Sequence, residues 1–125
     1  MIMKKVNTEK SPAAIGPYSQ AIKINDMIFT SGQIPFNAEG KLISDDVQKQ
    51  TRQSLNNVKN ILKEAGSSMD KVIKCTVFIS NMDDFTKINE IYQEFFSEPY
   101  PARSCVEVAR LPRSVKVEIE AIATI

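Results

Sequence analysis

Two segments of the chain repeat apolar residues at the spacing of an amphipathic helix. The first covers residues 45–65, where Ser44-Asp45-Asp46 offers an N-cap and Gly66 a C-terminal stop. Its apolar or small positions are Val47, Thr51, Leu55, Val58, Ile61, Leu62 and Ala65. The second helix begins near residues 80–83, and its apolar positions are Phe85, Ile88, Ile91, Tyr92, Phe95 and Phe96. Because proline cannot continue a helix, Pro99 and Pro101 end it near Ser97.

The other apolar segments are typical of strands, because they are short and rich in β-branched residues. Strands are predicted for residues 20–24, 27–33, 71–79, 103–109 and 114–125. Asn25-Asp26 tolerates a tight turn, so the first two strands should form a hairpin. A short strand or loop is expected through 36–43, and Leu111-Pro112-Arg113 separates the last two strands.

The last of these segments alternates between two kinds of side chain. One face carries Val115, Val117, Ile119, Ala121 and Ala123, and the other carries Lys116, Glu118, Glu120 and Thr124. We expect both helices to cover the apolar face. The result is an α+β fold, a two-layer sandwich with a mixed, mainly antiparallel sheet. With 125 residues, below the roughly 150 typical of one domain, residues 1–125 should form a single domain.

The opposite face of this sheet has an unusual predicted composition. It would carry Arg103, Cys105, Lys74, Thr76, Phe78, Glu118 and Ile122, while Ser104, Val106 and Val108 would point toward the helices. Charged side chains mixed with residues that are normally buried are uncommon on a fully solvated surface. We therefore expect another copy of the chain to cover this face.

Composition excludes several classes of function. The sequence contains no His, which excludes Ser-His-Asp and Cys-His catalysis, a His general base and His-containing zinc sites. A net charge of +1 lacks the basic field that attracts nucleic acid, and no stretch approaches the ~18 apolar residues of a membrane span. Cys75 and Cys105 have no CxxC partner, so we expect reduced thiols and a cytoplasmic protein. Four glycines form no phosphate-binding loop.

The residues themselves offer one candidate site, an arginine near a carboxylate. Arg103 begins a predicted strand and Glu118 lies within the last one. A guanidinium binds a carboxylate through two charge-assisted hydrogen bonds, and a nearby glutamate can hold or deprotonate water. A structural salt bridge between strands explains the same pair. Likewise Cys105 alone would be a structural thiol, Tyr18 a packed loop residue and Asn89 a solvent-facing helix residue.

Four motifs nevertheless match a known family when they are taken together and in order. They are SPAAIGPYSQA at 11–21, TSGQIP at 30–35, PARSCVEVARLP at 101–112 and VEIEAIA at 117–123. With these motifs the chain resembles the YjgF/RidA family, and within it the RidA subgroup of reactive-intermediate deaminases. The resemblance covers essentially the whole chain.

The resemblance implies an enzyme that hydrolyses 2-iminobutanoate and 2-iminopropanoate to 2-keto acids and ammonia. It implies a chorismate-mutase-like fold, and a homotrimer with clefts between subunits. Arg103 would bind the substrate carboxylate, Glu118 would position the water, and Cys105 would contribute main-chain contacts. The residues expected to line the cleft are Tyr18, Ser31, Gly32, Gln33 and Asn89. No cofactor or metal is required, because a protonated imine is already electrophilic and needs chiefly orientation and one water.

Two other readings compete with hydrolysis. The first is a trimer that binds small carboxylates without turning them over, as a regulator or chaperone. The presence of Glu118 argues against this alternative, because a second carboxylate beside the site would not strengthen the binding of a negatively charged ligand. The second is an RNA-cleaving translation inhibitor, which the near-neutral charge and the lack of His disfavour. Nucleic acid and membrane are therefore not expected as partners.

Overall fold

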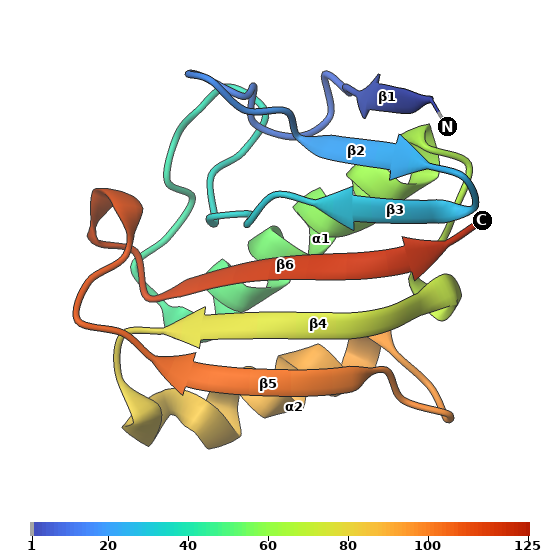
Figure 1. The fold of residues 1–125 in the computed structure, drawn as a ribbon. Helices are drawn as coiled ribbons and strands as arrows, with labels where there is room; N and C mark the ends of the chain where they lie inside the picture. Colours follow the sequence, from blue (N-terminus) through green and yellow to red (C-terminus); the bar gives the residue numbers. More distant parts are fainter. Residues whose placement is uncertain (1) are drawn as a thin grey trace.

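The protein forms a six-stranded sheet with two helices on one side, seen in a computed structural model that describes residues 2–125 (Figure 1). The helices are α1 (Val47–Glu64) and α2 (Phe85–Phe95). The strands are β1 (Met3–Val6), β2 (Ala21–Ile24), β3 (Met27–Thr30), β4 (Val72–Ile79), β5 (Ala102–Glu107) and β6 (Val117–Thr124). Single 3-10 turns at Met69–Lys71, Met82–Asp84 and Pro112–Ser114 connect them. The predicted α+β two-layer sandwich is confirmed.

The first helix begins and ends close to where the sequence placed it. Asp46 is the N-cap, and its side chain accepts a hydrogen bond from the backbone N–H of Lys49 at 2.9 Å. At the other end the chain turns at Gly66, which has φ +87°, and Ser67 N–H donates to the Leu62 carbonyl at 2.8 Å. These bonds satisfy groups that a helix end otherwise leaves open, so α1 stops at this glycine.

The strand order in the sheet is β1-β2-β3-β6-β4-β5. The predicted hairpin of β2 and β3 is present, and β6 lies antiparallel between β3 and β4. The edge strand β5 pairs with β4 in parallel, because the chain crosses over through α2 before it returns (Figure 1). The sheet is therefore mixed and mainly antiparallel, as predicted. Strand β1 was not predicted, since only Val6 of its four residues is buried.

The core lies between the sheet and the two helices. Its fully buried residues include Leu55 and Leu62 of α1, Val77 of β4 and Ile119 of β6. Burial of an aliphatic side chain of this size stabilises the folded state by about 1.5–3 kcal/mol relative to exposure. The alternation predicted for β6 is confirmed, because every second residue from Val117 to Ala123 is buried.

The strand predicted at 103–109 is present as β5, but the prediction of which residues face the helices was wrong. Arg103 and Cys105 pair with Cys75 and Val77 of β4, and paired residues share a face of the sheet. Cys75 and Val77 are core residues, so Arg103 and Cys105 lie on the helix side, where Cys105 packs against the core. Ser104 and Val106 instead lie on the open face, with Thr76 and Phe78. The sequence of β5 did not indicate which residues face the helices, because all but one of them are exposed and no alternation of apolar residues marks the inner side.

The rest of the open face is as predicted. Glu118 pairs with Phe78 of β4, and Ile122 pairs with Lys74 and with Phe29 of β3. Phe29 and Val106 are exposed large apolar side chains on this face. The open face is therefore a mixture of charged, aromatic and aliphatic groups. Within residues 2–125, no helix has the length and apolar character needed to cross a membrane.

Candidate active site

The segment after β3 is held beside β6 by backbone and side-chain hydrogen bonds. Gln33 N–H donates to the Ile119 carbonyl at 2.8 Å, and Ile119 N–H donates back to the Gln33 carbonyl at 3.1 Å. Ser31 Oγ donates to the Ser19 carbonyl at 2.6 Å, which joins this segment to the loop before β2. These bonds fix Gly32 in the position next to Glu118.

Glu118 packs directly on Gly32. A Cβ atom built on Gly32 would lie 2.3 Å from Oε2 of Glu118, well inside van der Waals contact. The half-buried carboxyl group is thus held over a stretch of backbone that has no side chain. Burial, and then repulsion from Glu120, raise the pKa of Glu118 above its ordinary value. A carboxylate whose pKa is raised in this way is a stronger base than one in water.

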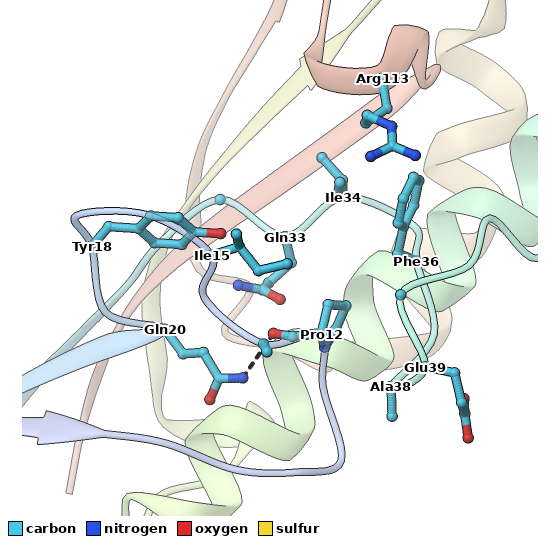
Figure 2. A pocket seen from close by; sticks show the side chains of 13 residues that line it. Pro12, Ile15, Tyr18, Gln20, Gln33, Ile34, Phe36, Ala38, Glu39 and Arg113 are labelled. Atoms are coloured by element: carbon cyan, nitrogen blue, oxygen red, sulfur yellow. Dashed lines mark hydrogen bonds between the residues drawn. The ribbon is translucent and has the colours of Figure 1, made fainter.

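A pocket of about 480 Å³ (Figure 2) is lined in part by Gly32, the residue that Glu118 contacts. Tyr18, Gly32 and Gln33, three of the predicted site residues, line it together with Ile34 and Phe36. Figure 2 shows side chains from three separate segments around it: the loop before β2, the segment after β3, and Arg113 in the turn before β6.

Buried amides hold the walls of this pocket. Gln20 accepts from the Thr8 N–H at 2.7 Å and donates to the Pro12 carbonyl at 2.8 Å, which closes the loop that carries Tyr18. Asn57 of α1 donates to the Phe36 carbonyl at 2.8 Å. Hence the pocket is held by polar groups in the core, while Tyr18 itself is 53% exposed.

Arg103 belongs to a second group of residues, on the helix side of the sheet. Its NH1 donates to Oδ1 of Asn89 at 2.7 Å, and its guanidinium carbon lies 4.7 Å from the centre of the Tyr92 ring. A cavity of about 400 Å³ opens here, lined by these residues with Gln93, Tyr100 and Pro101. The hydrogen bond brings two predicted site residues together, Asn89 and Arg103.

The two groups lie on opposite faces of the sheet in one chain. Glu118 shares the open face with Phe78, whereas Arg103 shares the helix face with Cys75. The expected pairing of Arg103 with Glu118 within one chain is therefore wrong. The sequence also missed the aromatic contacts of Arg103, because Phe85 and Tyr92 were interpreted only as core residues. Phe85, Asn89 and Tyr92 stand at positions i, i+4 and i+7, which places them on one face of a helix. This spacing could have indicated a shared contact surface.

The two thiols differ in their surroundings. Cys75 is fully buried, and burial raises its pKa to about 11. Cys105 is partly exposed, and burial raises its pKa as well, while the charge of Arg103 lowers it. Thiolates form less readily when the pKa is raised, so neither residue has the environment of an activated nucleophile. Over residues 2–125, no three His, Cys, Asp or Glu side chains are grouped to hold a metal ion.

The whole chain can be compared with known families and structures. Residues 8–125 match the model of the family described as Endoribonuclease L-PSP. The chain belongs to this family, which is the YjgF/RidA family named above from its motifs.

Relatives from Escherichia coli K12 are about half identical to the chain. A protein named putative reactive intermediate deaminase TdcF is 54% identical in an alignment of length 125 that covers 97% of each chain. A 2-iminobutanoate/2-iminopropanoate deaminase is 52% identical in an alignment of length 123 that covers 96% of each chain. The crystal structure of E. coli TdcF with bound serine matches with a TM-score of 0.92 at 50% identity and covers 98% of both chains.

Proposed function

We propose that the protein hydrolyses short 2-imino acids, with 2-iminobutanoate and 2-iminopropanoate as substrates, to 2-keto acids and ammonia. The observation that supports this proposal most is that, among residues 2–125, the guanidinium group of Arg103 contacts only neutral groups. Its guanidinium is held against α2 by neutral groups, and within residues 2–125 no carboxylate lies within ion-pair distance of it. A guanidinium in that state is suited to bind a substrate carboxylate through two parallel hydrogen bonds.

Glu118 supplies the second part of the chemistry. Its raised pKa and its fixed place over Gly32 suit a carboxylate that takes a proton from water as the water oxygen attacks C2 of the protonated imine. The C–O bond forms as the C=N π electrons move to nitrogen, which gives a carbinolamine. The protonated Glu118 then returns the proton to the amine. The C–N bond breaks to release ammonia, and the Glu118 carboxylate takes the proton of the hydroxyl group as the carbonyl forms.

A second copy of the chain is needed to bring these two parts together. Since one chain holds Arg103 and Glu118 on opposite faces of its sheet, we propose that each site combines Arg103 of one copy with Glu118 of another. The exposed apolar side chains of the open face, including Phe29 and Val106, support its burial against another copy. A homotrimer with three such clefts matches the family resemblance.

The names of the relatives support a deaminase more than a binding protein. Relatives at 50–54% identity are named deaminases, and the TdcF crystal structure contains bound serine, which carries a carboxylate. Arg103 would serve a carboxylate-binding regulator equally well. A base such as Glu118 would then have no role, so hydrolysis accounts for more of the described site. The family description also names an endoribonuclease, but a net charge of +1 and the lack of His do not favour RNA binding and cleavage by this chain.

The test generates 2-iminobutanoate from threonine with a dehydratase and traps it with semicarbazide. We expect the protein to divert the imine to 2-ketobutanoate and to lower the trapped fraction, in proportion to its concentration. A catalytic amount that leaves the trapped fraction unchanged, while calorimetry shows 2-ketobutanoate binding, would support the regulator instead. Release of acid-soluble nucleotides from RNA would point to the ribonuclease.

A further inference from the structure

Three side chains of α2 surround the guanidinium group of Arg103. They are Phe85, Asn89 and Tyr92, here called the orienting stripe. The guanidinium carbon lies 5.3 Å from the centre of the Phe85 ring and 4.7 Å from that of Tyr92. Both distances are within the range of a cation–π interaction. Asn89 accepts a hydrogen bond from NH1 at 2.7 Å.

The spacing of these residues puts both rings and the amide within reach of one guanidinium group. Residues 85, 89 and 92 fall on one face of a helix, and the first and last are about 10.5 Å apart along its axis. Asn89, on the turn between the rings, then fixes the rotation of the guanidinium plane.

All three contacts are electrically neutral, and this has a consequence for binding. Aromatic faces and an amide oxygen attract a cation without cancelling its charge. The ion pair found within residues 2–125 joins Arg52 and Glu94, on the outer surface of the helices, so no protein carboxylate competes for Arg103. The bond to Asn89 uses NH1, which leaves the edge formed by NH2 and Nε for a two-point contact.

Tyr92 is the most firmly held member of the stripe. It is 5% exposed, and its ring packs against Phe96 with centroids 4.6 Å apart. Burial, with Cys75 beside it, raises the pKa of its phenol, so Tyr92 stays neutral at all pH values at which the protein would act. Asn89 and Phe85 are both half-buried, and Phe85 lies at the start of the helix.

We propose that the orienting stripe is the positioning element that sets the affinity of Arg103 for the substrate carboxylate. This inference rests on the proposed function, because it assumes that Arg103 is the carboxylate anchor. The three residues act through Arg103 and touch no reacting atom. Their contribution should therefore appear in substrate binding, as KM and as Kd for a carboxylate, and much less in kcat.

The experiment measures binding of 2-ketobutanoate by calorimetry, and KM and kcat for 2-iminobutanoate, in matched variants. Tyr92→Leu should raise Kd and KM on the order of tenfold and change kcat less than about threefold. Tyr92→Phe keeps the ring and should recover most of that loss. Phe85→Leu should weaken binding several-fold, whereas Phe95→Leu should not. Phe95 is also a half-buried aromatic of α2 that packs against the core, and the rings in contact with Arg103 are those of Phe85 and Tyr92, so Phe95 is the control for lost packing.

Asn89→Asp is the sharper variant, because it changes charge and hardly changes shape. A carboxylate 2.7 Å from NH1 would form an ion pair with Arg103 and compete with the substrate. We expect Asn89→Asp to weaken 2-ketobutanoate binding more than Asn89→Leu does, by at least about tenfold. A purely structural role predicts the reverse order, since aspartate keeps the hydrogen bond and leucine removes it. If Tyr92→Leu does not fold, Asn89→Asp still tests the proposal.

Arg103→Lys separates failure of this inference from failure of the proposed function. If Arg103→Lys binds 2-ketobutanoate like the wild type, the carboxylate anchor is wrong, and the inference fails with it. If Arg103→Lys loses binding while Tyr92→Leu and Asn89→Asp bind normally, the anchor stands and only the orienting stripe is wrong. Weakened binding in Arg103→Lys, Tyr92→Leu and Asn89→Asp, with kcat nearly constant in the two stripe variants, supports both.

Discussion

The carboxyl group of Glu118 rests on the α-carbon of Gly32, closer than any side chain at position 32 would allow. A Cβ built there lies 2.3 Å from Oε2 and 2.8 Å from Cδ of Glu118. The backbone of Gly32 does not have the positive φ found at Gly16, Gly40 and Gly66. Glycine is therefore needed at position 32 for space, because a side chain there would keep the Glu118 carboxylate away from the backbone.

Gly32→Ala should therefore displace Glu118 and lower imine hydrolysis on the order of 10–100-fold. Unfolding should become easier by only about 1–3 kcal/mol, the usual cost of overpacking. Turnover in the dehydratase assay and urea denaturation measure the two effects. In a Glu118→Gln background the added alanine should cost little further activity. A full additive loss in the double variant would show that Gly32 acts independently of Glu118.

Arg103→Lys should lower imine hydrolysis while the fold is retained. Lysine keeps the positive charge and loses the planar fork that binds both carboxylate oxygens. The loss corresponds to about 1.5–3 kcal/mol, or roughly 10–150-fold in kcat/KM. Circular dichroism and light scattering confirm that the variant is folded and assembled. Wild-type kcat/KM in such a variant would contradict the anchor role.

Cys105→Ser and Glu118→Gln should have opposite outcomes. Serine preserves the main chain at 105 and removes a thiol that the proposed reaction does not use, so most activity should remain. Glutamine has nearly the same shape as glutamate but cannot accept the proton of the attacking water, so most activity should be lost. The same coupled assay measures both. Loss of turnover in Cys105→Ser together with near-normal Glu118→Gln would indicate a thiol nucleophile.

Glu118→Gln should also make the protein more stable at neutral pH. The pKa of Glu118 is raised in the folded state by burial and by Glu120, so the folded chain binds this proton more tightly than the unfolded chain. Stability then falls as pH rises from the unfolded pKa through the folded one. The urea midpoint of Glu118→Gln should exceed that of the wild type at about pH 7.5, and the difference should shrink toward zero near about pH 3, where this carboxyl group is protonated in both the folded and the unfolded wild type. An equal gain at both pH values would refute the linkage.

The assembly should have the mass of three chains. One chain has a mass of 14.0 kDa, so light scattering at micromolar concentration should give about 42 kDa. A mass near that of one chain would leave Arg103 and Glu118 on separate faces with no partner, and the proposed site would not exist. Substitution of Phe29 or Val106 by aspartate on the open face should lower the mass.

The elements of the fold follow from local patterns, which explains why most of them were predicted. The caps at Asp46 and Gly66 mark α1, and the buried alternation of β6 marks its inner face. The order of the strands in the sheet depends on long-range pairing, which no local pattern contains. For β5 the apolar signal was absent as well, so Arg103 was assigned to the wrong face.

The site was predicted less completely than the fold. The motifs named the residues, and the structure brings Arg103 next to Asn89 and Glu118 next to Gly32. Periodicity assigned Tyr92 correctly to the core, and Tyr92 is buried. It could not show that one face of the same ring also meets a guanidinium, because that contact depends on where a distant strand returns along the sheet.

The placement of Arg103 and Glu118 on opposite faces also bears on the genetics of such a protein. In a ring of three, each chain would lend its arginine to one cleft and its glutamate to the next. A copy defective in one of these residues would disable a single cleft, but a copy defective in both would disable two of the three. In a cell that also makes normal chains, an allele defective in both residues would therefore be more strongly dominant than an allele defective in one.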